Sequence, residues 1–131
     1  MVVKLISTYR TIPDYNGDEP WNLSNPQIYG LPKTTEAFRI SLESDKPEPY
    51  LGAWYMTPET SVLDRPTVLY LHGIGQTRGY YHRVGLYKVL LEEGYPVLAL
   101  DYRGFADSTE IEDIRETTVV EDAARAMAYL R

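Results

Sequence analysis

A histidine and two glycines directly follow a short apolar segment near the middle of the chain. Residues 68–71 read VLYL, and His72, Gly73 and Gly75 come next. Glycine lets the backbone turn tightly and leaves its N–H groups uncovered, so that they can meet a negatively charged oxygen. A pyrophosphate-binding loop is one use of such a turn.

A second pair of polar residues follows the next apolar segment. Asp101 and Arg103 come directly after residues 97–100, which read VLAL. A glycine loop followed by an acid at the end of the next strand is also typical of a dinucleotide site. The proline-rich residues upstream argue against a dinucleotide site, because a dinucleotide fold normally begins with its glycine strand. A nucleotide-dependent oxidoreductase is therefore the less favoured alternative.

The elements that must position these residues form one strand, helix, strand unit over residues 66–104. Both apolar segments lack polar alternation, which is typical of buried parallel strands. Between them an apolar stripe at helical spacing predicts a helix, which Gly94 and Pro96 end. Such a unit is right-handed and meets its ligands at the carboxyl ends of the strands. The stripe consists of Tyr80, Val84, Tyr87 and Leu91.

The segments before this unit predict a hairpin and a lead segment. Apolar alternation indicates strands at 34–42 and 50–57, and the short connection between them favours antiparallel pairing. Residues 1–33 contain four prolines, which break any long element. We expect this lead segment to lie on the surface of the domain, fixed by Trp21, Ile28, Tyr29 and Leu31.

A final helix is predicted after an acidic loop at 105–116. Thr118 and Glu121 have the spacing of a capping box, so the helix is expected to begin at Thr118. Its core-facing stripe is expected to consist of Val120, Ala123, Ala124, Met127 and Leu130.

Composition excludes several classes of function. The chain has 131 residues, enough for about one domain. A net charge of -6 argues against binding to nucleic acid. Without cysteine and with only two histidines, neither a disulfide framework nor a metal site is expected, and we expect no cofactor. No apolar segment approaches the roughly 20 residues of a membrane span, and no signal peptide is expected, so the compartment stays open.

The motifs L-Y-L-H-G, T-R-G, H-R-V, L-Y-K-V-L and D-Y-R-G lie between residues 69 and 104. Together they resemble the amino-terminal half of the α/β-hydrolase superfamily, and are most similar to the abhydrolase-domain lipases that act on lysophosphatidylserine and monoacylglycerols. The resemblance implies an α/β fold in which an antiparallel hairpin joins a parallel pair of strands, with one helix on each face. The implied sheet order is 34–43, 50–57, 96–101 and 67–72, and the implied domain is 34–131.

The resemblance also implies roles for the glycine loop. The backbone N–H of Ile74 would help to form the oxyanion hole, supported by His72, Gly73 and Gly75. Asp101 and Arg103 would tether the end of their strand. His82 and Ser108 are interpreted as structural.

The catalytic residues that such an oxyanion hole would serve are not found in these 131 residues. A serine hydrolase of this fold needs a G-x-S-x-G elbow, and none of the serines lies in such a frame. The resemblance implies that nucleophile, acid and base lie beyond Arg131. We therefore expect the amino-terminal part of a serine hydrolase of lipid esters, inactive alone, or alternatively a non-catalytic binding module.

Two kinds of partner follow from this interpretation, besides the lipid ester substrate. A truncated sheet would leave the outer edge of the strand at 67–71 open. This edge is expected to bind a complementing carboxy-terminal half or a second copy of the chain, unless the lead segment covers it.

Overall fold

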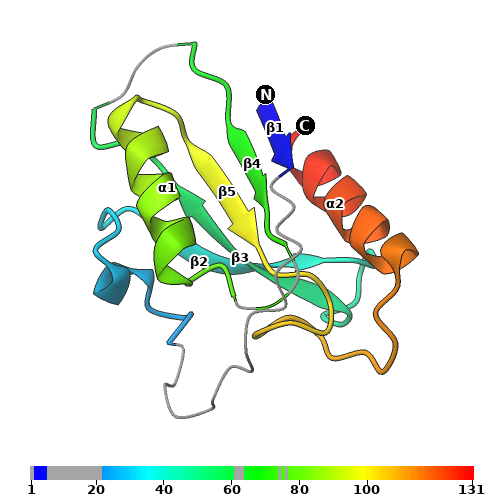
Figure 1. Ribbon diagram of the computed structural model, residues 1–131. Helices are drawn as coiled ribbons and strands as arrows, with labels where there is room; N and C mark the ends of the chain where they lie inside the picture. Colours follow the sequence, from blue (N-terminus) through cyan, green and yellow to red (C-terminus); the bar gives the residue numbers. More distant parts are fainter. Residues whose placement is uncertain (1, 6–21, 61–63, 74, 76) are drawn as a thin grey trace.

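The computed structural model describes residues 2–5, 22–60, 64–73, 75 and 77–131. Three layers are visible in Figure 1, with a twisted sheet between two helices. The elements in chain order are β1 (Val2–Leu5), the short 3₁₀ helix η1 (Pro26–Tyr29), β2 (Glu36–Ser41), β3 (Tyr50–Met56), β4 (Val68–Leu71), α1 (Tyr81–Glu92), β5 (Val97–Leu100) and α2 (Glu116–Leu130).

The sheet has the predicted order with one strand added. Its strands run β1-β4-β5-β3-β2. β2 and β3 form the antiparallel hairpin, β3 pairs antiparallel with β5, and β4 pairs parallel with β5. The predicted hairpin, the predicted parallel pair and the predicted place of β5 between them are therefore confirmed.

The two helices cover opposite faces of the sheet, as predicted from right-handed crossovers. α1 packs on one face and α2 on the other (Figure 1). All four residues of β4 and all four of β5 are buried, because both of their faces are covered. The α1 face of the core includes Trp54, Met56, Tyr70, Val84, Tyr87, Leu91 and Ala99. The α2 face includes Leu51, Ala53, Leu69, Leu71, Leu98, Leu100 and Ala126.

α1 ends where the sequence predicts. Gly94 has a φ of 88°, in the left-handed region that only glycine adopts without strain, and its N–H donates to the carbonyl of Leu91 at 3.0 Å. Three of the four residues of the predicted stripe are buried, while Tyr80 is the N-terminal cap of the helix. Arg83, which lies outside this stripe, is also buried.

α2 begins earlier and presents a different face than predicted. The helix starts at Glu116, and the hydroxyl of Thr118 accepts a hydrogen bond from the N–H of Arg115 at 3.4 Å, so Thr118 lies in the first turn and is not the cap. Val120 is 60% exposed and Ala124 is also exposed, which makes the predicted stripe wrong at these positions. The side chains that pack on the sheet are Val119, Ala123, Ala126, Met127 and Leu130.

The lead segment contacts the α1 side of the core through residues that were only partly predicted. Leu31 is buried and the ring of Tyr29 lies 5.2 Å from that of Trp54, as expected of anchors. Ile28 is 59% exposed, so its predicted anchoring role is wrong, because the short 3₁₀ helix turns it away from the core. Leu23 is the buried anchor instead of Ile28, and its carbonyl accepts a hydrogen bond from Trp54 Nε1 at 2.7 Å. Trp21 lies outside the described residues.

The outer edge of β4 is not open. β1 pairs parallel with β4, with Val2 opposite Val68 and Leu5 opposite Leu71. The beginning of the lead segment therefore covers this edge, which is the exception that the prediction allowed. No helix in the described part of the chain is long and apolar enough to cross a membrane.

Candidate functional site: the loops at the carboxyl ends of β4 and β5

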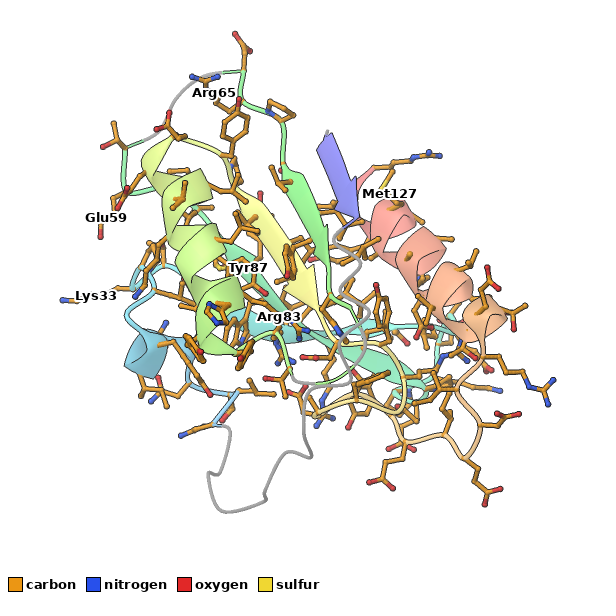
Figure 2. The ribbon with its side chains drawn as sticks, viewed as in Figure 1. Lys33, Glu59, Arg65, Arg83, Tyr87 and Met127 are labelled. Carbon is orange, nitrogen blue, oxygen red and sulfur yellow. The ribbon has the colours of Figure 1, made fainter. Side chains whose placement is uncertain are left out.

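The candidate site lies where β4 and β5 end side by side. The two strands are parallel neighbours in register, so their carboxyl ends meet at one edge of the sheet. The loop after β4 leads into α1, and the loop after β5 leads into α2. Arg83 lies at the end of α1 nearest these loops (Figure 2). The fold thus brings together the two groups of residues that the sequence singled out.

His72 joins the two loops. Its Nδ1 lies 2.6 Å from the carbonyl oxygen of Gly73, and its Nε2 lies 3.3 Å from the backbone nitrogen of Tyr102. A neutral ring protonated on Nδ1 satisfies both contacts, since Nδ1–H donates to the carbonyl and Nε2 accepts from the amide. Burial lowers the pKa of His72, and Arg83 and Arg78 lower it further against the opposing charge of Asp101. The ring is therefore a neutral structural link at neutral pH.

This lowered pKa makes stability depend on pH. The unfolded chain binds a proton at His72 as the pH falls through the ordinary value of 6.5, whereas the folded chain does not. We expect the free energy of unfolding to fall between about pH 7 and about pH 5, and to fall less steeply in His72→Gln. Urea denaturation across this range measures both slopes. His82→Gln, a change at an exposed histidine, is the control, and equal slopes in the wild type and His72→Gln would contradict the assignment.

Asp101 is the centre of a buried ionic network. Its side chain is fully buried and accepts hydrogen bonds from the backbone N–H of Arg78 at 3.1 Å and from Arg78 Nη1 at 2.7 Å. Arg78 also pairs with Asp107 through both of its terminal nitrogens, at 2.6 and 2.8 Å, and its guanidinium lies 5.0 Å from the ring centre of Trp54. Asp101 thus fixes the glycine loop to the end of β5.

Ser108 is used structurally. Its hydroxyl donates to the carbonyl of Asp101 at 2.6 Å and accepts from the N–H of Gly52 at 2.9 Å. Gly52 itself has no room for a side chain, because a Cβ there would lie 2.7 Å from Cγ of Asp107. The loop after β5 is therefore packed tightly onto β3, and the Ser108 hydroxyl has no free role as a nucleophile.

Arg103 ties the same loop to α2. Its Nε pairs with Asp122 at 2.8 Å, its backbone N–H donates to the same carboxylate at 2.8 Å, and Nη2 pairs with Glu121 at 2.9 Å. Asp122 is fully buried, and burial raises its pKa against the opposing effect of Arg103. Arg103 thus holds the second turn of α2 beside the end of β5.

Two arginines that the sequence analysis did not single out hold the glycine loop. Arg78 binds the carboxylates described above, and Arg83 donates to the carbonyls of Gly75 and Thr77, at 2.8 Å each. Gly75 adopts a φ of 84°, which explains why glycine stands there. Ile74, the predicted oxyanion donor, lies outside the described residues. The T-R-G and H-R-V motifs were the signals that could have pointed to these arginines.

The side chains of this site hold the backbone of the glycine loop in position. Among the residues that the structure describes, no cluster of three metal-ligating side chains exists. His82 is exposed on α1, with its ring beside that of Tyr81 at 4.0 Å. The acidic side chains and the histidine at the strand ends are bonded to backbone groups and to arginine side chains. The site is therefore formed by the backbone of the loop.

A separate hollow of about 640 Å³ lies beside the other end of α1. It is lined by the lead segment, by the segment after β3 and by α1, with Lys33, Glu59, Lys88 and Leu91 among its residues. Because Leu91 and Arg83 are two turns apart on α1, this hollow is distinct from the glycine loop.

The comparisons with known proteins agree with this fold. Residues 66–131 match the family described as the alpha/beta hydrolase fold. Over 103 residues the chain is 37% identical to the lysophosphatidylserine lipase ABHD12 of Xenopus tropicalis and 53% identical to that of Bos taurus. Each alignment covers 66% of this chain, with 26% of the Xenopus protein and 25% of the Bos protein. The chain thus spans about a quarter of the length of these relatives.

Solved structures show the same architecture. An esterase from Pyrococcus furiosus superposes with a TM-score of 0.62 at 20% identity, over 97% of this chain and 41% of the esterase. An α/β serine hydrolase homologue from Coxiella burnetii gives 0.57 at 21% identity, over 72% of this chain and 44% of that protein. At such identities the superpositions show the fold alone. Since the family match covers half of the sequence and the sheet has the predicted order, this chain belongs to the α/β-hydrolase family.

Proposed function

We propose that this chain supplies the oxyanion-loop portion of a serine hydrolase that acts on lipid esters, of the lysophospholipase or monoacylglycerol lipase kind. The observation that carries the proposal is the loop after β4, where the carbonyl of Gly73 is bound by His72 and the carbonyls of Gly75 and Thr77 are bound by Arg83 of α1. Such bonds fix the peptide groups of a loop before a substrate arrives, as an oxyanion hole requires. The names of the relatives from Xenopus tropicalis and Bos taurus support lysophosphatidylserine as the substrate class.

The proposed donor is the backbone N–H of Ile74, supported by His72, Gly73 and Gly75. The hydrogen bond between His72 Nδ1 and the Gly73 carbonyl, at 2.6 Å, supports this assignment, because it holds the loop residue that precedes the proposed donor. One oxyanion donor contributes roughly 3 kcal/mol to transition-state stabilisation, but only where a tetrahedral intermediate forms. The attacking serine, with its acid and histidine, must therefore come from sequence outside these residues.

The test is complementation. Ester hydrolysis is expected from a mixture of this chain and a family segment that carries the serine, acid and histidine, and from neither part alone. If this chain binds such a segment and the mixture stays inactive, the non-catalytic binding module is the better account.

We propose that the complementing segment pairs with β4 at the edge that β1 occupies. The two would compete for the same backbone groups of residues 68–71. β1 has only four residues, so its pairing presents a small barrier to replacement by a longer strand.

Removal of residues 2–5 is expected to increase self-association of the chain. Without β1, the apolar strand β4 exposes backbone donors and acceptors that invite pairing with another chain. Sedimentation velocity over a range of concentrations should show a larger oligomeric fraction for the deletion than for the whole chain. Lys4→Ala, which keeps the backbone of β1, is the control. A deletion variant that stays as monomeric as the whole chain would show that β1 does not protect this edge.

A further inference from the structure

α1 carries apolar side chains on its outer side as well as on the side that faces the core. Val84, Tyr87 and Leu91 are buried against the sheet. Away from them, Val89 is 55% exposed and Leu86 is only partly buried. A surface helix normally has polar residues opposite the core, whereas a helix that is apolar all round is normally covered on all sides. The outer side of α1 is therefore suited to a further contact.

The uncovered flank of α1 faces the β4 edge of the sheet. The other flank lies against the lead segment, since a Cβ added at Gly30 would be 2.8 Å from Nζ of Lys88. The lead segment in turn packs over β3, and β4 and β1 lie on the other side of β5. With 3.6 residues per turn, Leu86 and Leu90 lie opposite Lys88 on the helix. We call Leu86, Val89 and Leu90 the α1 flank.

α2 has a similar flank on the opposite face of the sheet. One side of this helix contacts β2, because Arg125 Nε donates to a carbonyl of that strand at 2.8 Å and Tyr129 lies 5.3 Å from one of its rings. Val120, Ala124 and Met127 lie on the side away from these contacts. Val120 is 60% exposed, and Figure 2 shows Met127 on the β1 side of α2. We call these three residues the α2 flank.

The two flanks and the edge of β4 form one surface across all three layers of the domain. Both flanks consist of uncharged, apolar residues, and depletion of charge is typical of the core of a protein–protein interface. The strand that now covers the edge, β1, has only four residues. Pairing of strands alone is marginally stable in water, so a longer-lived contact at this edge requires apolar burial on the faces as well.

We infer that the two flanks form a docking surface for a strand that carries an apolar helix on each of its faces. The inference rests on the proposed function, which identifies this partner as the carboxy-terminal family segment that pairs with β4. The esterase from Pyrococcus furiosus supports the identification, because the shared fold covers 97% of this chain but only 41% of that protein. The fold therefore accommodates further chain there.

Substitutions at the most exposed residue of each flank test the surface. Val89→Lys and Val120→Glu introduce charges whose signs suit the nearer helix end. Each should weaken binding of the family segment, with its elbow serine replaced by alanine, about tenfold in isothermal titration calorimetry. The urea midpoint of the chain itself should not change. Ile28→Lys, at a position 59% exposed in the lead segment, is the matched control and should bind like the wild type.

Milder variants cover the case in which a charged variant does not fold. Val89→Thr and Val120→Thr remove apolar area without adding a charge, and each should weaken binding about threefold. Weaker binding at only one of the two positions would overturn a surface that spans both faces.

The outcomes distinguish this inference from the proposed function. Equal affinities of the wild type, Val89→Lys and Val120→Glu would overturn the inference even if the catalytically complete mixture hydrolyses esters, and so would failure of the segment to bind the wild-type chain. Weaker binding by both variants supports the inference even if the complete mixture is inactive, in which case only the proposed function fails. If the variants instead reduce self-association of the chain in sedimentation velocity and leave binding of the segment unchanged, the surface joins two copies of the chain and the inference is overturned.

Discussion

Replacing Asp101 with alanine is expected to lower the free energy of unfolding by about 3–5 kcal/mol. Asp101 is fully buried and binds both the backbone and the guanidinium of Arg78, which is itself only 1% exposed. Its loss leaves a buried cation with one partner, the partly exposed Asp107, and removes the acceptor that holds the loop to the end of β5. Urea denaturation at neutral pH measures the change.

An exposed ion pair gives the matched control. Glu121 pairs with Arg103 at 2.9 Å, but its side chain is 68% exposed. Glu121→Ala should therefore change the free energy of unfolding by less than about 1 kcal/mol. If Asp101→Ala were as mild as Glu121→Ala, the buried network would not be what joins the two loops of the site.

The regular elements could be predicted because their signals are local. Uninterrupted apolar segments identify β4 and β5, and Gly94 with Pro96 identifies the end of α1. The sheet order came from the resemblance to the hydrolase family and was confirmed by the pairing of β3 with β5. These features depend on residues close together in the chain or on a family pattern.

The errors lie where tertiary contacts override the local pattern. In α2 the alanines are spread around the helix, so apolar spacing alone did not distinguish Ala124, which is exposed, from Ala126, which is buried. The buried face also includes Asp122, which is there because Arg103 pairs with it across the loop. A polar residue type is normally expected at the surface.

In the site, too, tertiary contacts were not predictable from the local sequence pattern. Arg78 and Arg83 were not predicted to be buried, because their partners are a carboxylate more than twenty residues away and the carbonyls of a loop. The lead segment was allowed as a cover for the edge of β4, but a strand at residues 2–5 was not predicted, since its partner β4 lies beyond the hairpin in the sequence. Such pairings exist only once the chain has folded.

The second large effect is expected in catalysis. This chain has the loop but no G-x-S-x-G elbow, so alone it should hydrolyse p-nitrophenyl butyrate and lysophosphatidylserine no faster than buffer does. Mixed with a carboxy-terminal segment of a family member that carries the elbow, the acid and the histidine, it should form a complex that hydrolyses both esters. The gain should reach several orders of magnitude over either part alone, because nucleophile and oxyanion hole act only together.

The control is the same carboxy-terminal segment with its elbow serine replaced by alanine. This segment should still bind the chain, as measured by sedimentation, and give no hydrolysis. Binding without activity in the control thus separates assembly from chemistry.

The most direct test is the initial rate of lysophosphatidylserine hydrolysis by the purified chain alone, by the complementing segment alone and by the two together. Our account predicts hydrolysis only in the mixture, and its loss when the added serine becomes alanine. A chain that hydrolyses the ester by itself, or that neither binds the segment nor gains activity from it, would contradict the account.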